Sequence, residues 1–201
     1  MENLHLIVGL GNPGAEYSRT RHNAGFLLAR LLAERWHAEW HDEAKFTARV
    51  ARAECDSHRC LLCLPQTYMN ASGVAVAAVI AYYRLPLSRL LVVVDDADLP
   101  LGELRLRPGG SSGGHHGLES LEQHLGGRGY ARLRLGIGRQ AQNGRRLTGH
   151  VLGRFTADEA ALLEKVLARA AEQVSCWVSI GLDMAMNRFN GLVTALEPKD
   201  N

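Results

Sequence analysis

Residues 6–26, with the sequence LIVGLGNPGAEYSRTRHNAGF, decide the fold that we expect for this chain. Residues 6–8 form an apolar run that is typical of a buried strand. A cluster of turn-forming residues at 9–14 ends that strand abruptly. Polar residues at 20–23 follow, directly before a helical pattern. Because open α/β sheets place their ligands at the ends of strands and the starts of helices, this stretch predicts a functional site.

The glycines of this stretch raise the alternative of a dinucleotide-binding turn. Gly9, Gly11 and Gly14 match the spacing G-x-G-x-x-G. That turn requires the helix to begin inside the glycine run, so that the helix N-terminus holds the pyrophosphate. Here eight residues separate Gly14 from Asn23, and the acidic residue about twenty positions on, Glu34, falls inside the helical pattern. The spacing is that of a loop, and no cofactor is expected.

Length and composition indicate one ordinary globular domain. The chain has 201 residues, of which 46% are hydrophobic and 22% charged, enough to bury a substantial core. We expect a single domain over residues 1–195 and a short polar tail over residues 196–201. Glu2 and His5 interrupt the N-terminal region, which argues against a signal peptide, and the longest apolar run, at 74–83, covers about half a membrane span. The expected location is the cytoplasm, with no membrane partner.

Apolar patterns of the strand type and the helix type alternate along the chain. This order predicts a single α/β domain with a mixed, mostly parallel, twisted sheet flanked by helices. Strands are expected at residues 4–10, 45–54, 59–64, 90–94, 104–107 and 133–137, with a hairpin turn at 56–58. Helices are expected at 24–36, from about 72 to 84 with Asn70 or Ser72 as the cap, from a capping box at Thr156 and Glu159 onward, and at 184–189.

Three cysteines and a histidine lie close together in the sequence and superficially match a zinc ligand set: Cys55, His58, Cys60 and Cys63. However, Cys60 and Cys63 lie in an apolar run that reads as a strand, and residues three apart on a strand point to opposite faces. The pair could not hold one ion. We expect buried, reduced thiols and no metal.

Basic residues are concentrated in one part of the chain. Residues 105–154 contain nine arginines and two acidic residues, although the whole chain has a net charge of only +2. Arg105 and Arg107 share one face of an expected strand, and so do Arg132 and Arg134. This spacing favours a face that binds a polyanion over the alternative, a scattered solvated surface.

Polar residues follow three of the apolar runs. Asn12, Asn70 and Asp95 each come shortly after an expected strand. If those strands are neighbours, their C-terminal ends bring the three side chains together with His22. A histidine beside a carboxylate is the arrangement of a general base, because the acid fixes the tautomer and stabilises the imidazolium. The alternative for a histidine at a helix start is a cap or an ordinary surface residue.

Residues 110–114, GSSGG, formally match the G-x-S-x-G motif of serine hydrolases. That motif requires a buried strand before it, but here the preceding residues alternate leucine with arginine. A nucleophilic Ser112 is therefore disfavoured. The segment 108–114 reads better as a mobile lid that enters a helix near His115 or His116.

Several motifs, in order and correctly spaced, resemble the bacterial-type peptidyl-tRNA hydrolases over residues 4–190. They are GLGNPG at 9–14, Tyr17, TRHNAG at 20–25, PQTYMN at 65–70 with Ser72 and Gly73, DDADLP at 95–100 and GGHHG at 113–117. The resemblance implies a monomeric α/β hydrolase of the phosphorylase/hydrolase-like kind, without metal or cofactor. It would cleave the ester that joins a peptide to the 3′ end of tRNA, and so recycle tRNA from aborted translation.

The resemblance also implies roles for individual residues. His22 matches the catalytic base, Asp95 the acid that orients it, and Asn12 the residue that distinguishes blocked from free aminoacyl groups. The substrate-contacting positions at the tRNA end or the peptide are Tyr17, Tyr68, Met69, Asn70 and His116. Arg107 and Arg134 match a basic pair that clamps the 5′ phosphate of the acceptor stem.

Two residues depart from the family pattern. His116 stands where the family usually has asparagine, and Leu64 replaces a common lysine, which puts a peripheral phosphate contact in doubt. The competing class is a non-catalytic RNA-binding protein on the same fold, which the basic face would serve equally well. The intact set of His22, Asp95, Asn12 and Asn70 favours the hydrolase.

Overall fold

The computed structural model describes residues 4–138 and 147–193. In this part of the chain, eight strands form one sheet in the order β2-β3-β4-β1-β5-β7-β6-β8. The expected polar tail at 196–201 and the end of the expected domain lie outside the described residues. The strands are β1 (Leu4–Gly9), β2 (Trp40–Glu43), β3 (Ala48–Cys55), β4 (His58–Pro65), β5 (Leu90–Asp96), β6 (Glu103–Arg107), β7 (Ala131–Gly136) and β8 (Gly191–Leu192).

The sheet has a parallel centre and antiparallel flanks. Strands β4, β1, β5 and β7 pair in parallel, whereas β2 and β3 on one side and β6 and β8 on the other are joined by antiparallel pairing. The predicted mixed sheet is confirmed, but the expectation that it is mostly parallel is wrong, because only the four central strands pair in parallel and the other four pairings in the described residues are antiparallel. At Asp56 and Ser57, both φ angles are positive, as a two-residue hairpin turn requires, so β3 and β4 are antiparallel.

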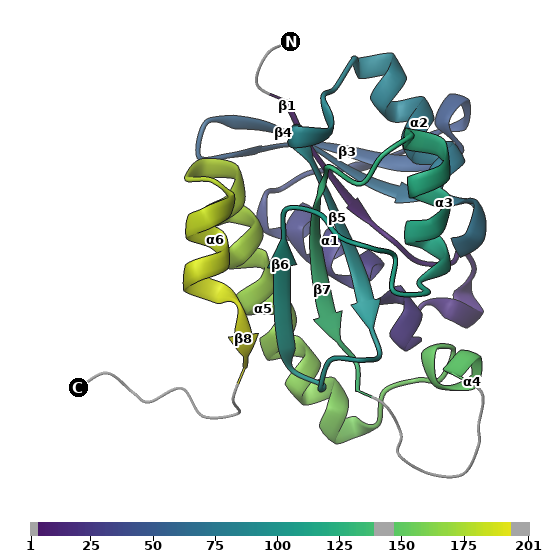
Figure 1. Ribbon diagram of the computed structural model, residues 1–201, viewed down its shortest axis with the longest axis vertical. Helices are drawn as coiled ribbons and strands as arrows, with labels where there is room; N and C mark the ends of the chain where they lie inside the picture. The colour runs from purple at the N-terminus through teal and green to yellow at the C-terminus, as the bar shows by residue number, and fades with distance from the viewer. Residues whose placement is uncertain (1–3, 139–146, 194–201) are drawn as a thin grey trace.

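Helices cover both faces of the sheet (Figure 1). Helices α1 and α5 contribute to one core cluster, and α2 and α3 to the other. The α-helices are α1 (Ala24–Arg35), α2 (Ser72–Tyr83), α3 (His116–Leu125), α4 (Leu147–Val151), α5 (Ala157–Ser179) and α6 (Leu182–Phe189). Five short 3-10 helices lie between these elements in the described ranges: η1 (Ala15–Tyr17), η2 (Arg21–Asn23), η3 (Ala44–Phe46), η4 (Met69–Ala71) and η5 (Leu87–Arg89).

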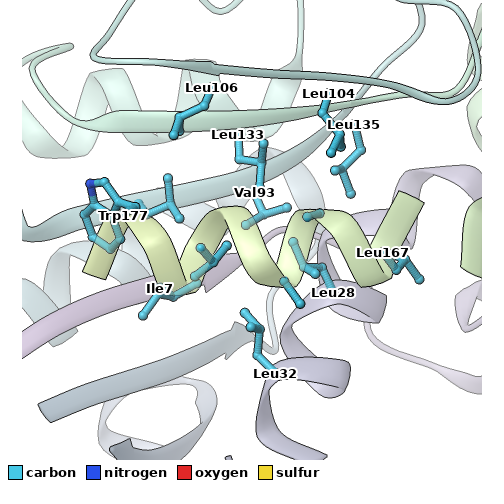
Figure 2. Packing of buried hydrophobic residues seen from close by; sticks show 14 of the residues in the cluster. Ile7, Leu28, Leu32, Val93, Leu104, Leu106, Leu133, Leu135, Leu167 and Trp177 are labelled. Carbon is cyan, nitrogen blue, oxygen red and sulfur yellow. The ribbon is translucent and has the colours of Figure 1, made fainter. Parts of the chain in front are cut away.

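The central strands are buried on both faces, which explains their continuous apolar runs. Ile7 of β1 points into the cluster formed with α1 and α5, whereas its neighbours Leu6 and Val8 point into the cluster with α2 and α3. Figure 2 shows the first cluster, in which Leu28 of α1 and Leu167 of α5 lie near Val93 of β5. The central strands are thus held between two helical layers. No helix in the described ranges has the length and apolar character needed to cross a membrane.

Most of the expected elements are present within a few residues of their expected bounds, but α4 and β8 were not predicted, and further details differ. The polar strand β2 was not predicted, and residues 45–46 belong to η3 rather than to a strand. The expected caps of α2 are wrong, because its N-cap is Ala71 and makes no side-chain cap bond. The preceding turn η4 already satisfies the backbone N–H groups of Ala71 and Ser72. The capping box of Thr156 and Glu159 at the start of α5 is confirmed.

All four cysteines are free and buried. Cys60 and Cys63 point into opposite core clusters, as the strand geometry predicts. Burial raises the pKa of both thiols to about 12. They are packing residues of β4 and are not arranged to share an ion.

Candidate active site

The site forms at the C-terminal ends of the parallel strands β4, β1 and β5. Helix α1 reaches these ends because Gly9 and Gly25 let it touch β1 directly: a Cβ atom on Gly9 would lie 2.2 Å from the carbonyl oxygen of Gly25. The turn η2 precedes α1 and therefore brings His22 to the same edge of the sheet as Asp95, the penultimate residue of β5. This is the edge that the sequence predicts.

Asp95 accepts hydrogen bonds from two histidines on one carboxylate oxygen. Its Oδ1 atom lies 2.9 Å from Nδ1 of His22 and 3.1 Å from Nε2 of His115. The side chains of Asp95, His22 and His115 are 3%, 12% and 8% exposed. Burial alone would raise the pKa of the Asp95 carboxyl, but the hydrogen bonds from His115 and His22 outweigh burial and hold this pKa well below its usual range. Asp95 is therefore ionised at neutral pH.

The hydrogen bonds define the tautomers of both rings. Nδ1 of His115 accepts the backbone N–H of Leu118 at 3.4 Å, so the proton of the neutral ring is on Nε2, which donates to Asp95. An ionised carboxylate can only accept, so Nδ1 of His22 also carries a proton. In a neutral ring, Nε2 of His22 then has a free lone pair. No group in the described residues hydrogen-bonds to that atom.

The same three side chains are the group in the described residues with the spacing of a metal site. One ligand atom from each of His22, Asp95 and His115 lies within 4.8 Å of the other two. However, both nitrogen atoms facing Asp95 carry protons and have no lone pair to offer. A metal would require both rings to change tautomer, and His115 would then lose its hydrogen bond from Leu118, which caps α3. The network is that of an oriented base.

Asn12 connects the end of β1 to the turn η4. Its side-chain oxygen accepts the N–H of Met69 at 2.8 Å, and both side chains are nearly buried. Because that oxygen is used within the protein, the amide nitrogen of Asn12 remains to donate into the pocket, where Asn12 is a lining residue. Tyr68, next to Met69, is 64% exposed at the rim.

A pocket of about 490 Å³ lies over these groups. It brings together eight of the predicted site residues: Asn12, His22, Tyr68, Met69, Asn70, Asp95, His116 and Arg134. Tyr17 in η1 and Arg107 at the end of β6 do not line it. The remaining wall comes from Asp96, Ala97, Asp98, Gly113, Gly114, His115, Val151 and Leu152.

His115 is the residue that sequence reasoning missed. The sequence has two adjacent histidines, and the family pattern implies a substrate contact for His116. In the structure, His116 lines the pocket but is 74% exposed, and its Nδ1 lies 3.0 Å from Glu119 on the same helix. His115 points inward to Asp95 instead. The sequence feature that could have separated the two histidines was the expected helix start near them. The side chain of the residue before a helix points in a different direction from that of the first helical residue.

The arginines predicted to share one basic face differ in their exposure. Arg132 is 1% exposed, pairs with Glu122 at 3.1 Å and lies over the ring of Tyr130. Arg134 is 17% exposed and pairs with Asp96 at 2.9 Å. Arg107 is exposed, and it forms no hydrogen bond or ion pair within residues 4–138 and 147–193. Arg139, Arg145 and Arg146 lie outside the described residues.

The turn that carries His22 is connected to the start of α5 by Arg21. Arg21, next to His22, is 5% exposed and pairs with Glu159 at the start of α5 at 2.7 Å. Its backbone N–H also donates to the carbonyl oxygen of Gly153. The turn η2 is thereby tied to the C-terminal part of the chain.

Leu64, the replacement for a common lysine, is 1% exposed and packs with Phe26 and Ala29, so this position belongs to the core.

Comparisons with known proteins identify the family of this chain. A sequence model of the family described as peptidyl-tRNA hydrolase matches residues 6–199. The peptidyl-tRNA hydrolase of Synechococcus sp. (strain JA-3-3Ab) is 50% identical over 189 residues, which are 94% of this chain and 84% of that protein. That of Gloeobacter violaceus is 46% identical over 187 residues, which are 93% of this chain and 94% of that protein.

Solved structures show the same arrangement of elements. The crystal structure of peptidyl-tRNA hydrolase from Acinetobacter baumannii matches with a TM-score of 0.89 and 38% identity, over 96% of this chain and 97% of that one. A structure of peptidyl-tRNA hydrolase with N-propanol matches with a TM-score of 0.90 at the same identity. Because the family model matches residues 6–199 and a relative is 50% identical over 94% of the chain, this chain belongs to the peptidyl-tRNA hydrolase family.

Proposed function

We propose that this chain hydrolyses the ester bond between a peptide and the 3′ end of tRNA, with His22 as the general base. The observation that carries the proposal is the His22–Asp95 hydrogen bond at 2.9 Å, which leaves Nε2 of His22 as the free acceptor of a neutral ring in the pocket. A pocket of about 490 Å³ has the size of a small-ligand site. It has room for the ester and its neighbouring groups.

The reaction follows from the proton positions. Nε2 of His22 takes a proton from a water molecule as the water oxygen attacks the ester carbonyl carbon. The imidazolium that forms is stabilised by ionised Asp95, which His115 holds in place. When the tetrahedral intermediate breaks down, the C–O bond to the ribose is cleaved and the proton returns to the ribose oxygen. The products are a peptide carboxylic acid and tRNA with a free 3′ hydroxyl.

Asn12 and Asn70 are proposed to position the acyl part of the substrate. Nδ2 of Asn12 is a donor for a peptide carbonyl oxygen, because Oδ1 is already bonded to the N–H of Met69. Such a carbonyl exists in an N-blocked aminoacyl group and not in a free one. This would make Asn12 the residue that selects peptidyl-tRNA over aminoacyl-tRNA, as the family resemblance implies. Asn70 is exposed at the same rim and offers a second amide.

The nucleic-acid part is proposed to lie over the exposed aromatic and basic side chains. Tyr68 presents an exposed ring on which an unpaired base of the 3′ CCA end can stack. Tyr17 and Met69 are proposed to contact the same end of the tRNA or the peptide, and His116 the substrate at the pocket rim. Arg107, which has no partner in the described structure, is suited to the 5′ phosphate of the acceptor stem. The assignment of Arg134 to that phosphate stays a prediction.

The decisive experiment is hydrolysis of N-acetyl-aminoacyl-tRNA by the purified chain with a metal chelator present. Release of N-acetyl-amino acid by the wild-type chain and not by His22→Ala would support the proposal. The matched control substrate is the same aminoacyl-tRNA with a free amino group, which should not be hydrolysed. Binding of tRNA without hydrolysis would favour the alternative, a non-catalytic RNA-binding protein. We also propose that the enzyme acts in the cytoplasm and that it is a monomer. Sedimentation in solution would test the monomeric state.

A further inference from the structure

We infer that Arg134 is a positioning residue that holds the glycine-rich segment 109–114 against the end of β5 and thereby keeps His115 on Asp95. This inference rests on the proposed function, because it concerns the same hydrolysis. It differs from the phosphate-binding role that the family resemblance implies for Arg134. The difference can be measured on a substrate that has no 5′ phosphate.

Arg134 uses its planar guanidinium to join two parts of the chain. Its Nη1 atom donates to Oδ2 of Asp96 at 2.9 Å, and its Nη2 atom donates to the carbonyl oxygens of Ser111 at 2.8 Å and Ser112 at 3.4 Å. A guanidinium presents its donors in a fixed fork, so the two groups are held in one plane. Arg134 and Asp96 are 17% and 12% exposed, and such a shielded pair is weakened less by salt than a surface pair.

The segment that Arg134 holds has little structure of its own. Residues 109–114 contain four glycines, and Gly110, Gly113 and Gly114 have positive φ angles. Glycine loses more conformational freedom on ordering than any other residue, so such a segment needs contacts from outside to stay in one conformation. Two of those contacts are the carbonyl oxygens that Arg134 binds.

The link continues from this segment to the site. The carbonyl oxygen of Ser112, which accepts from Arg134, also accepts the backbone N–H of His115 at 3.2 Å. The ring of His115 then donates to Asp95. At the other end, Oδ1 of Asp96 is fixed by the N–H of Asp98 at 2.8 Å, so the carboxylate that anchors Arg134 is itself oriented. Arg134 thus binds the main chain shortly before His115 and the side chain of the residue after Asp95.

The test uses Arg134→Ala and a matched control, Arg105→Ala. Arg105 lies directly opposite Arg134 in the β6–β7 register, but its side chain pairs with Glu103 and not with the glycine-rich segment. Two substrates are compared: N-acetyl-aminoacyl-tRNA and the N-acetyl-aminoacyl ester of a CCA trinucleotide. The second substrate has no acceptor stem, so loss of a contact to the 5′ phosphate of that stem cannot affect the rate at which this substrate is hydrolysed.

For Arg134→Ala, we expect kcat to fall about 10–100-fold on both substrates, because small misplacements of catalytic groups cost about that much. The KM for the trinucleotide ester should change little, and added guanidinium ion should restore part of the rate. The ¹⁵N signals of the His115 ring should shift, whereas those of Arg105→Ala should match the wild type. A wild-type kcat on the trinucleotide ester, with the loss limited to KM for the full tRNA, would overturn the inference.

Asp96→Asn is the second variant, for use if Arg134→Ala does not fold. It removes the charge that anchors Arg134 but keeps the oxygen that accepts the N–H of Asp98. We expect a smaller kcat loss of the same kind, and no loss would count against the inference. If the wild-type chain itself hydrolyses neither ester, the proposed function fails. The ¹⁵N signals of His115 would still report whether Arg134 positions that ring.

Discussion

The side chain of Asn23 brackets the backbone of Asn12. Its Oδ1 atom accepts the N–H of Asn12 at 2.9 Å, and its Nδ2 atom donates to the carbonyl oxygen of Asn12 at 2.9 Å. Asn23 is 1% exposed, so these two bonds satisfy polar groups that water does not reach. Asn23, the residue after His22, therefore fixes the loop that presents Asn12.

Asn23→Asp should disturb this arrangement without changing the size of the side chain. A carboxylate can accept the N–H of Asn12 but cannot donate to its carbonyl oxygen, and it adds a buried charge. We expect the free energy of unfolding to fall by about 1–3 kcal/mol, with a loss of kcat/KM for blocked substrates. Urea denaturation and hydrolysis assays measure both effects. An unchanged free energy of unfolding would show that the two hydrogen bonds between Asn23 and Asn12 do not stabilise the fold.

His22→Ala should abolish turnover and retain tRNA binding. Removal of the proposed general base is expected to lower kcat by about 10²–10⁴-fold, because Nε2 of His22 is the acceptor proposed for the proton of the attacking water. Hydrolysis of N-acetyl-aminoacyl-tRNA and tRNA binding by fluorescence titration would be measured on the same preparation. Near-wild-type hydrolysis would end the mechanism proposed here.

Asp95→Asn should lower kcat by about 10²–10⁴-fold with little change in KM. Two N–H donors meet at Oδ1 of Asp95, so an amide in its place cannot stabilise the imidazolium and cannot serve both rings with the same strength. Steady-state kinetics separate the two parameters. A raised KM with kcat intact would mean that Asp95 contacts the substrate instead of the base.

Arg107→Ala should raise KM for tRNA substrates and flatten its dependence on salt. Each lost phosphate contact reduces the slope of log affinity against log salt by about 0.7–0.9. The N-acetyl-aminoacyl ester of the CCA trinucleotide should be hydrolysed at the wild-type rate. Equal losses on both substrates would show that Arg107 supports the fold.

His5 predicts a pH dependence of stability at the end of β1 away from the site. Its ring is 6% exposed, packs on Trp177 and lies 2.9 Å from Nη1 of Arg89. Burial first, and then the charges of Arg89 and His58, lower its pKa from 6.5 to about 4. Between these values the unfolded chain binds a proton that the folded chain does not, so the free energy of unfolding falls as pH drops through this range.

The variant that tests this is His5→Phe, which keeps a ring on Trp177 and does not titrate. Between pH 7 and pH 4.5, the wild type should lose about 2 kcal/mol more stability than this variant. Denaturant unfolding at the two pH values measures the difference. Identical losses would show that His5 does not contribute.

Much of the fold follows from local sequence signals. The runs that form β1 and β5 are continuous and apolar, and the capping box at Thr156 fixes the start of α5 without reference to the rest of the chain. The meeting of Asn12, Asn70 and Asp95 follows from one topological rule, namely that neighbouring parallel strands end at the same edge. The sequence did not predict β2, because three of its four residues are polar and it is an edge strand held by pairing with β3.

The parts of the site that could not be predicted depend on contacts between distant segments. Which of two adjacent histidines faces Asp95 depends on where α3 begins, and a shift of one residue would exchange them. The partners of Arg134 come from residues 96 and 111–112, and no pattern in the sequence of β7 reveals them. The exposure of a side chain likewise depends on tertiary packing. The spacing of arginines along the sequence therefore does not reveal that Arg132 is buried and Arg107 is exposed.

The tie between Arg21 and Glu159 has a consequence for the time at which the enzyme becomes active during its own synthesis. The turn that carries His22 is closed by Glu159 and by the carbonyl oxygen of Gly153. A nascent chain that has emerged only as far as β7 contains His22, Asp95 and His115 but has no partner for the buried guanidinium of Arg21. We therefore expect the turn that carries His22 to be completed only when the start of α5 has left the ribosome, so that hydrolytic activity appears late in elongation.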